Sequence, residues 1–318
     1  MNKIFSLGHA RLGRIERSRL VPEGQRGDRF FLSIASQSQS LAGEPSLLIK
    51  QRLDTLLVEL DLCSSRQLAQ RLIRAGEVVV NQQVIDKPGT EIETSAQIQI
   101  KERSPYVSRG GEKLVKALQV FAVKVTGRIC LDGGISTGGF TDCLLQAGAK
   151  QVYGIDVGYG QVDWRLRNDP RVILLERTNL RYLQPAQLYK DAKPADLGVV
   201  DVSFISLTKV LPALWQLLSY PKEAVLLVKP QFEVGRSRVG KKGVVRHPED
   251  QADAIFQVWQ AAQQIGWQYR GLTWSPLLGP AGNIEYLLWL GMDSQTPAPN
   301  LDSIQQITKS ARSDLISL

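Results

Sequence analysis

The chain has 318 residues, 43% of them hydrophobic and 22% charged, which suffices for about two domains with apolar cores and excludes disorder throughout. The formal net charge of +8 favours a polyanionic partner, either a nucleic acid or an anionic membrane surface. Three cysteines without a CxxC pair and only two histidines argue against a disulfide scaffold and a histidine-centred metal site, so we expect a metal-free protein of the reducing cytoplasm.

Residues 1–46 are expected to form a basic extension without a fixed fold. Their arginines are scattered without an apolar stripe, and the stretch from residue 33 to residue 40 is polar. The N-terminus lacks the apolar core and small-residue cleavage site of a secretory signal. No apolar run approaches the ~18–20 residues that cross a bilayer, so we expect no stable membrane insertion.

Residues 47–103 are predicted to form a small α+β domain. Leucines at helical spacing indicate a helix over residues 52–60, and a second helix is predicted over residues 65–75. Ser64 is the expected N-cap of that second helix, and Gly76 is expected to end it. Short alternating runs that follow the second helix predict a hairpin and a further strand.

The second predicted helix carries charge of one sign. It contains three arginines and no acidic residue. Such a face is most often merely solvated, but an unbalanced positive charge also suits the phosphates of RNA. We predict RNA contacts from this small domain at Arg52, Arg66, Arg71 and Arg74.

Residues 104–291 alternate strand and helix patterns, which indicates a sheet with helices on both faces. Strands are predicted at 129–132, 151–156, 172–175, 197–201, 225–228, 268–275 and 285–290. Helices are predicted at 139–147, 207–218 and 248–265. The last two strands are consecutive, so they should form an antiparallel hairpin at one edge of the sheet. The polar residues 292–318 are expected to form a peripheral tail.

A glycine-rich turn follows the first of these strands. Residues 131–140 read LDGGISTGGF, so a buried strand runs through glycines into a helix, where nucleotide-like ligands bind at the edge of parallel sheets. The spacing matches neither GxGxxG nor a phosphate-binding P-loop. Asp132 at the end of the strand suits a cationic ligand better than a pyrophosphate, and S-adenosylmethionine carries an ammonium and a sulfonium but no phosphate.

A second acidic residue, Asp156, ends the next strand. A carboxylate at that position can accept hydrogen bonds from both hydroxyls of a cofactor ribose. These two features alone leave three interpretations open: a methyl-donor site, a dinucleotide site and a purely structural turn.

Six ordered motifs within residues 50–291 make the sequence resemble a known family. They are SRGGEKL at 108–114, DGGISTGGF at 132–140, ERTN at 176–179, DVSFISL at 201–207, KPQFE at 229–233 and GNIE at 282–285. Together they are similar to the TlyA family of rRNA 2′-O-methyltransferases, members of which are also described as hemolysins and whose catalytic domain is related to FtsJ. Residues 47–103 also resemble the small S4-type RNA-binding domain.

The resemblance implies a Rossmann-like, seven-stranded methyltransferase domain behind a small N-terminal RNA-binding domain. It also implies a catalytic set that matches the motifs here at Lys113, Asp201, Lys229 and Glu285. We expect Lys229 to be the base, with Asp201 to orient it, while Lys113 and Glu285 position the ribose. Such a lysine must have its pKa lowered from about 10.4, and nearby positive charge would do this.

The cofactor implied is S-adenosylmethionine. Its expected contacts are Asp132, Gly134, Ser136, Thr137, Gly138, Asp156 and Asn179. A basic, glycine-punctuated loop over residues 235–243 is expected to contact RNA phosphates, or else to be an ordinary solvated loop. Its basic residues, together with one residue of the SRGGEKL motif, are Arg236, Arg238, Lys241, Lys242 and Arg109.

The expected function is therefore 2′-O-methylation of ribose in ribosomal RNA, at a cytidine if the family pattern holds, with rRNA or ribosomal subunits as partners. Three alternatives stay open. A membrane-active hemolysin would show leakage from liposomes, a nicotinamide oxidoreductase would bind a dinucleotide, and a non-catalytic ribosome assembly factor would bind RNA without methylating it.

Overall fold

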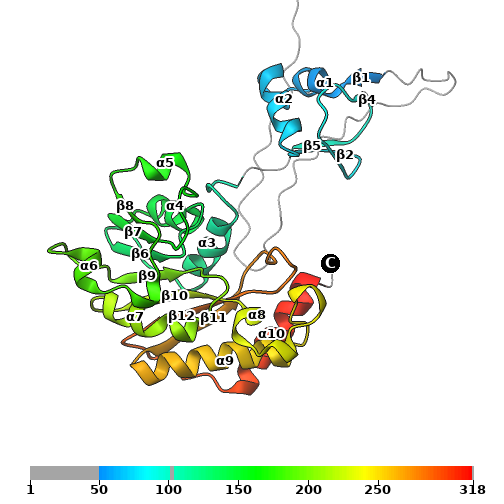
Figure 1. The fold of residues 1–318 in the computed structure, drawn as a ribbon. Helices are drawn as coiled ribbons and strands as arrows, with labels where there is room; N and C mark the ends of the chain where they lie inside the picture. Colours follow the sequence, from blue (N-terminus) through cyan, green and yellow to red (C-terminus); the bar gives the residue numbers. More distant parts are fainter. Residues whose placement is uncertain (1–49, 101–103, 317–318) are drawn as a thin grey trace, which may run out of the picture. The chain divides into compact units, whose positions relative to one another are not determined.

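The computed structural model describes residues 50–100 and 104–316 (Figure 1). These residues fall into two compact units, one before and one after residue 103, and each unit has a hydrophobic core of its own. The expectation for residues 1–46 lies outside the described part of the chain.

The first unit is a small α+β domain, as predicted. Its elements are β1 (Lys50–Arg52), α1 (Leu53–Glu59), α2 (Arg66–Arg74), β2 (Val78–Val80), β3 (Gln83–Ile85), β4 (Glu91–Glu93) and β5 (Ile98–Ile100). Strand β1 pairs antiparallel with β4, and β2 lies between β3 and β5. The core is built from one side of each helix, since Leu53 and Leu57 meet Ala69, Ile73 and Val78.

Two boundaries in this unit differ from the prediction. The first helix begins after Arg52, because that residue is extended and pairs with Glu91 in the short β1–β4 ladder. The N-cap of α2 is Ser65 rather than Ser64, since the Ser65 hydroxyl accepts a hydrogen bond of 3.2 Å from the backbone N–H of Leu68.

The second unit is built on a seven-stranded sheet in the order β11-β12-β10-β9-β6-β7-β8. The strands are β6 (Ile129–Gly133), β7 (Gln151–Ile155), β8 (Val172–Leu175), β9 (Leu197–Val200), β10 (Glu223–Val228), β11 (Gln268–Trp274) and β12 (Tyr286–Gly291). The predicted strands are confirmed to within two residues at each end. The expected antiparallel hairpin is also confirmed, with β11 at the edge and β12 paired to β10.

The chain changes direction across the sheet between β6 and β9, which lie side by side and parallel. From β6 the chain proceeds outward to β7 and β8, and it then returns to β9 and continues to β10. In open α/β sheets, ligands bind at such a switch point, beyond the carboxyl ends of the strands. The glycine-rich turn after β6 and Asp201 after β9 both lie there.

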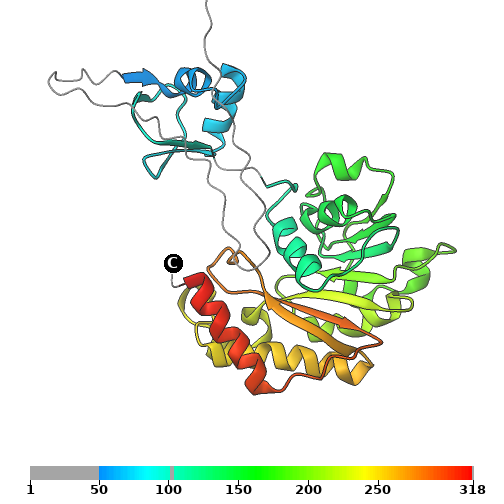
Figure 2. The ribbon, with the colours of Figure 1, turned by 180° about the vertical axis from the view of Figure 1, so that it is seen from behind.

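Helices cover both faces of this sheet (Figures 1 and 2). Side chains of α3 (Gly110–Val120), α4 (Gly139–Gln146) and α5 (Trp164–Arg167) pack on one face. The other face is covered by α6 (Pro185–Tyr189), α7 (Leu211–Leu217), α9 (Pro248–Ile265) and α10 (Leu301–Ile316). Short helical segments complete the fold: η1 (Leu180–Tyr182), η2 (Leu207–Lys209), α8 (Pro230–Glu233), η3 (Arg236–Arg238) and η4 (Lys241–Gly243).

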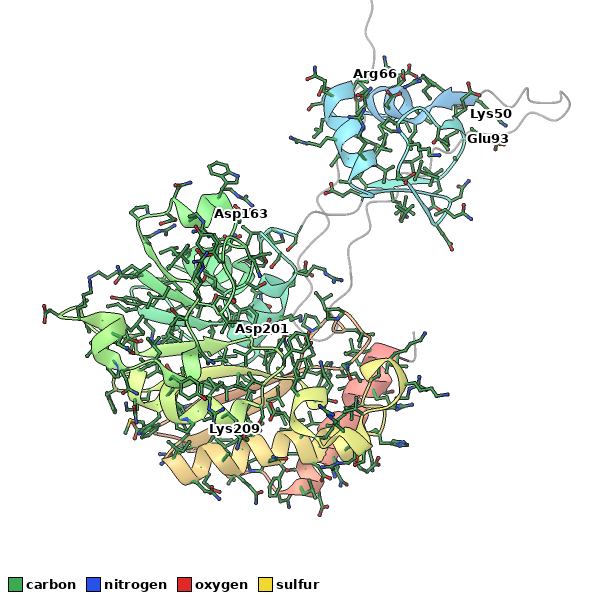
Figure 3. All side chains as sticks on the ribbon, viewed as in Figure 1. Lys50, Arg66, Glu93, Asp163, Asp201 and Lys209 are labelled. Carbon is green, nitrogen blue, oxygen red and sulfur yellow. The ribbon has the colours of Figure 1, made fainter. Side chains whose placement is uncertain are left out.

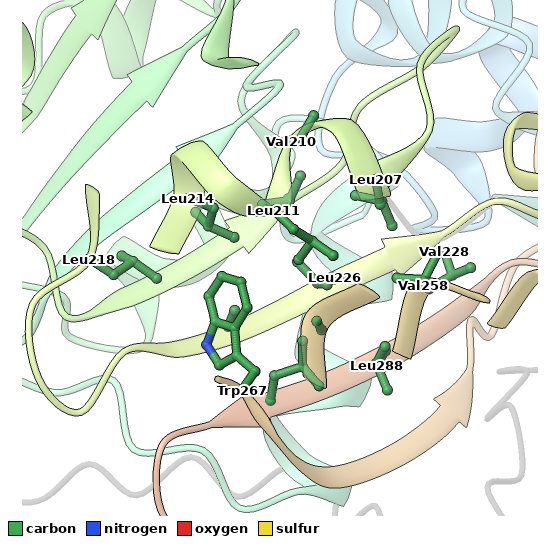
Figure 4. Packing of buried hydrophobic residues seen from close by; sticks show 14 of the residues in the cluster. Leu207, Val210, Leu211, Leu214, Leu218, Leu226, Val228, Val258, Trp267 and Leu288 are labelled. Atoms are coloured by element: carbon green, nitrogen blue, oxygen red, sulfur yellow. The ribbon is translucent and has the colours of Figure 1, made fainter. Parts of the chain in front are cut away.

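Strand β10 shows how one buried strand serves both layers. Val225 and Leu227 join the core under α3 and α4, whereas Leu226 and Val228 join the core under α7 and α9, because successive side chains on a strand point to opposite faces. Figure 4 shows the second of these cores, in which Leu226 and Val228 lie among residues of α7, α9 and β12.

The C-terminal segment was wrongly expected to be a peripheral tail. Residues 301–316 form helix α10, which packs along α9 (Figure 2) and buries Ile304, Thr308 and Ala311 completely. The polar appearance of the segment arises because only one side of an amphipathic helix is apolar. No helix in residues 50–100 or 104–316 is long and apolar enough to cross a membrane.

Candidate active site

Two cavities meet at the switch point of the sheet. The larger, of about 540 Å³, is lined by the loops after β7, β8 and β9. The smaller, of about 210 Å³, is lined by the start of α3, the glycine-rich turn and residues 277–280. Gly134, Ser136 and Asp201 line both, so the turn after β6 forms part of a wall common to the two cavities.

The glycine-rich turn is shaped by close approach of the backbone. Gly134 has a φ of +88°, and a Cβ atom there would lie 2.4 Å from the carbonyl oxygen of Asp201, so only glycine fits. Gly138 has a φ of +99°, and a Cβ there would lie 2.2 Å from Leu166 Cδ1. Gly138 lines neither cavity and turns the backbone into α4, and its direct contact with the cofactor stays a prediction.

Asp156 lies in the wall of the larger cavity, as expected for a residue that binds a ribose. Its Oδ2 accepts a hydrogen bond of 2.8 Å from the backbone N–H of Ser136, and its Oδ1 accepts one of 2.7 Å from Gly158. These bonds fix the carboxylate and leave acceptor capacity on both oxygens. Asn179 lines the same cavity and caps η1 through its Oδ1, while Thr137 lines the smaller cavity.

Asp132 behaves differently from Asp156, although both end neighbouring strands. Its side chain is fully buried and lines neither cavity, and its direct contact with the cofactor stays a prediction. Its Oδ2 accepts a hydrogen bond of 2.7 Å from the Thr141 hydroxyl, and its Oδ1 has no hydrogen-bond partner in residues 50–100 and 104–316. Burial raises the pKa of Asp132 to about 7, with a further contribution from the negative charge of Asp201.

The four predicted catalytic residues form two ion pairs. Lys229 Nζ lies 2.6 Å from Asp201 Oδ1 and donates a hydrogen bond of 2.8 Å to Ser203 Oγ. Lys113 Nζ lies 2.5 Å from Glu285 Oε2, with both side chains largely buried. Asp201 and Lys113 line the smaller cavity together, so each ion pair places one member at this space. Lys229 and Glu285 themselves line neither cavity, so the two ion pairs reach this space through Asp201 and Lys113.

Sequence reasoning gave no role to Glu233, which connects the loops after β9 and β10. Its buried carboxylate accepts hydrogen bonds of 2.6 Å from Ser206 Oγ and 2.8 Å from the backbone N–H of Leu207. Burial raises the pKa of Glu233. Its position in the KPQFE motif was visible in the sequence, but the partner loop was not.

Phe204 was also missed. Its side chain is 92% exposed, lines the larger cavity and stands on a backbone with a φ of +64°. A bulky residue in this left-handed region is strained, which points to a functional constraint. The exposed ring beside a cavity offers a stacking surface for a base.

Comparison with known families decides the class of protein. Residues 106–292 match the model described as FtsJ-like methyltransferase. The chain belongs to the FtsJ-like methyltransferase family. Residues 51–98 match the S4 domain, so the resemblance found in both parts of the sequence is confirmed.

Relatives of this FtsJ-like protein carry two kinds of name. The 16S/23S rRNA (cytidine-2'-O)-methyltransferase TlyA of Mycobacterium tuberculosis is 49% identical over 76% of this chain and 90% of its own length. Hemolysin A of Brachyspira hyodysenteriae is 40% identical over 74% of this chain and 98% of its own length. A solved structure from Streptococcus thermophilus with a hemolysin name is 40% identical, covers 84% of this chain and 97% of its own, and superimposes with a TM-score of 0.65.

The S4 domain presents the arginines predicted to bind RNA. Arg66 Nε and Arg52 Nη2 each lie 3.0 Å from Oδ2 of the buried Asp54, and both arginines remain about half exposed (Figure 3 labels Arg66). The hydrogen bond from Arg52 holds the pKa of Asp54 well below its usual range. Arg71 and Arg74 are exposed on α2.

The basic loop of the FtsJ-like domain is only partly free. Arg238 is held by helix α9 through a 2.6 Å contact with Asp253. The remaining predicted residues of the basic surface are exposed: Arg109, Arg236, Lys241 and Lys242. The buried Asn283 anchors the loop by accepting a hydrogen bond from the N–H of Val245 and donating one to the carbonyl of Gly243.

Proposed function

We propose that this chain transfers a methyl group from S-adenosylmethionine to the 2′-hydroxyl of a ribose in ribosomal RNA, at a cytidine as the names of its relatives suggest. The observation that carries the proposal is the pairing of Lys229 with Asp201 beside the cavity that also receives Lys113. Family membership and the matching S4 domain support a methyltransferase that acts on RNA.

The larger cavity suits the nucleoside part of S-adenosylmethionine. Asp156 offers fixed carboxylate oxygens for the ribose hydroxyls, and Ile155, Val157 and Leu180 offer apolar surface for the adenine. When bound, the cofactor supplies an electrophilic methyl group on a cationic sulfur. Asp201 faces both cavities and places negative charge near that cation.

The residues around Lys229 can hold and accept a proton. A 2′-hydroxyl becomes a competent nucleophile when its proton leaves, and in the proposed reaction the neutral amine form of Lys229 accepts that proton at Nζ. The resulting ammonium is stabilised by Asp201 and by its hydrogen bond to Ser203 Oγ. The Lys113–Glu285 pair holds the substrate ribose, and Phe204 stacks on the target base.

The proposed substrate is rRNA within ribosomal subunits, bound by the exposed arginines of the S4 domain and by the basic loop over residues 235–243. A ribosomal substrate places the enzyme in the cytoplasm. Three buried cysteines without a disulfide in the described residues accord with a reducing compartment.

Transfer of a labelled methyl group to ribosomal subunits that lack the modification tests this function. Wild-type protein should label rRNA as a 2′-O-methyl nucleotide, and Lys229→Ala should reduce the rate by about 10²–10⁴-fold, the usual contribution of a general base, while it still binds S-adenosylmethionine. Lys209→Ala, at an exposed lysine of η2 labelled in Figure 3, is the matched control and should label normally.

Three results would count against the proposal. Labelling by Lys229→Ala at the wild-type rate would remove Lys229 as the base and make Lys113 the first alternative. Cofactor binding and RNA binding without any labelling would favour a non-catalytic assembly factor. Leakage from liposomes that proceeds without labelling would instead favour the activity named in some relatives.

A further inference from the structure

Two exposed arginine–tyrosine pairs lie on the loops that follow β7 and β8. The guanidinium of Arg177 stacks over Tyr159 at 4.3 Å from the ring centroid, and that of Arg181 lies 5.1 Å from the ring centroid of Tyr182. The two tyrosines are 65% and 64% exposed. None of these four residues has a role in the site described above.

Backbone hydrogen bonds hold the two loops side by side. The N–H of Arg177 donates to the carbonyl of Gly158 at 3.0 Å, and the N–H of Thr178 donates to the carbonyl of Asp156 at 2.8 Å. Arg177 adopts a φ of +53°, a left-handed conformation that is unfavourable for arginine. Strain of this kind persists where the surrounding structure enforces it, and it is concentrated at functional sites.

The arginines of this surface fall into two groups, those that are paired with a carboxylate and those that are not. Arg165, Arg167 and Arg171 are each neutralised by a nearby carboxylate, at 3.0, 2.6 and 2.7 Å respectively. Arg177 and Arg181 form no ion pair within the described residues. A guanidinium stacked on an aromatic ring keeps the N–H donors in its plane free, so both residues are prepared to bind an anion such as a phosphate.

The same loops border the larger cavity. Val157, Thr178 and Asn179 line it, and each lies within two residues of a member of the two pairs in the sequence. Another exposed aromatic residue, Trp164 on α5, belongs to the segment that follows the Tyr159 loop and is 71% exposed. Exposed aromatic rings among unpaired arginines are typical of surfaces that bind single-stranded nucleic acid.

We propose that Tyr159, Arg177, Arg181 and Tyr182, the Arg–Tyr strip, bind the phosphate backbone of unpaired rRNA that flanks the target nucleotide. The proposal rests on the proposed function, because it identifies the flanking strand as part of the same substrate. The guanidinium groups contact phosphates, and the tyrosine rings both orient the guanidinium groups and offer stacking surfaces to exposed bases.

The test measures binding of the full chain to unmodified ribosomal subunits over a range of salt concentrations. Arg177→Gln/Arg181→Gln should weaken binding by at least about tenfold and reduce the slope of log K against log salt by about two, one for each lost phosphate contact. Arg165→Gln/Arg171→Gln removes two arginines that are already neutralised, so it should bind almost as the wild type does. Binding of S-adenosylmethionine should be unchanged in both.

Wild-type affinity and an unchanged salt slope in Arg177→Gln/Arg181→Gln would overturn the proposal, as would an equal loss in the control. The single variant Arg181→Gln should lose about one unit of slope, and it avoids the strained backbone at Arg177. One outcome separates this inference from the proposed reaction. If the wild type never methylates rRNA, while the Arg177 and Arg181 variants still show a reduced slope of log K against log salt, the Arg–Tyr strip is supported and the reaction is not.

Discussion

Two acidic residues at the same edge of the sheet have opposite environments, and this decides their chemistry. Asp156 is held by backbone N–H groups beside a cavity, where a carboxylate can accept hydrogen bonds from a ligand. Asp132 is fully buried beside Thr141, and one of its oxygens has no hydrogen-bond partner among the described residues. The sequence shows both residues as acids at strand ends. Burial, which distinguishes them, is a property of the packed structure.

Asp132 should therefore make the stability of the cofactor-free protein depend on pH. Its pKa is about 7 when folded and 3.8 ordinarily, so the folded state binds a proton that the unfolded state releases between these values. The stability due to protonated Asp132 is complete below about pH 4, and it is lost at up to about 1.4 kcal/mol per pH unit as the pH rises towards 7. Asp132→Asn should lack this decline, as measured by denaturant unfolding at pH 5 and pH 8.

Thr141→Val is the companion variant for Asp132. It removes the one hydroxyl that donates to the carboxyl group, so the pKa of Asp132 should rise further and the loss of stability should extend to higher pH. Parallel pH profiles for the wild type and Asp132→Asn would show that Asp132 is not the group responsible.

At the scale of elements, the proposed catalytic centre depends on two loops that must be held in a fixed position relative to each other. The loop after β9 carries Asp201, Ser203 and Phe204, and the residues after β10 carry Lys229. Glu233 joins them through its bonds to Ser206 and Leu207, in addition to the Lys229–Asp201 pair. The two loops are thus connected at the proposed reacting groups, through Lys229 and Asp201, and also away from them, through Glu233.

Glu233→Ala should impair catalysis indirectly, because Glu233 acts on the position of a loop and not on the substrate. The change leaves the buried N–H of Leu207 without its partner, which typically costs about 1–3 kcal/mol of stability. We expect a decrease in kcat larger than any increase in KM, measured with ribosomal subunits, because the loop that carries Asp201 loses its support. Glu233→Gln keeps an acceptor for that N–H and should retain much more activity. Equal losses in the two variants would contradict a positioning role based on this hydrogen bond.

At the scale of the molecule, ion pairs stabilise the edge of the sheet opposite the cavities, and helix packing stabilises one of its faces. At the edge opposite the cavities, Arg128 binds Asp196 and Glu223, and Arg270 also binds Glu223 at 2.7 Å. On the face under α9, helix α10 adds buried residues at the far end of the chain. Firm packing around the sheet leaves the switch-point edge as the place where loops meet ligands.

Substitution of Ile304 measures how much the packing of α10 contributes to the stability of the core. It is fully buried in the cluster beneath the sheet, so Ile304→Ala should reduce the free energy of unfolding by about 2–5 kcal/mol. Ile316 lies on the same helix and is 52% exposed, so Ile316→Ala should change it by less than about 1 kcal/mol. Equal effects from the two substitutions, measured by denaturant unfolding, would show that α10 does not pack as described.

Much of the architecture could be predicted from the sequence, because local patterns of apolar, polar and turn residues indicate where strands and helices form. Apolar runs bounded by turn residues located the strands of the sheet, and the order of six motifs identified the family. The four residues proposed to be catalytic, Lys113, Asp201, Lys229 and Glu285, could be selected from the sequence because each belongs to a distinctive short motif. Helix α3 escaped prediction although it carries Lys113, because its glycine-rich start resembles a loop.

Only the tertiary structure decided which of these residues meet. Lys113 and Glu285 lie far apart in the chain and are paired because α3 and the segment before β12 converge on one cavity. The same packing keeps Asp132 and Gly138 out of the cavity walls, since Asp132 is fully buried and Gly138 packs against Leu166. Proximity depends on strand order and loop paths, which arise from long-range packing, whereas the sequence determines local conformation and the chemistry available at each position.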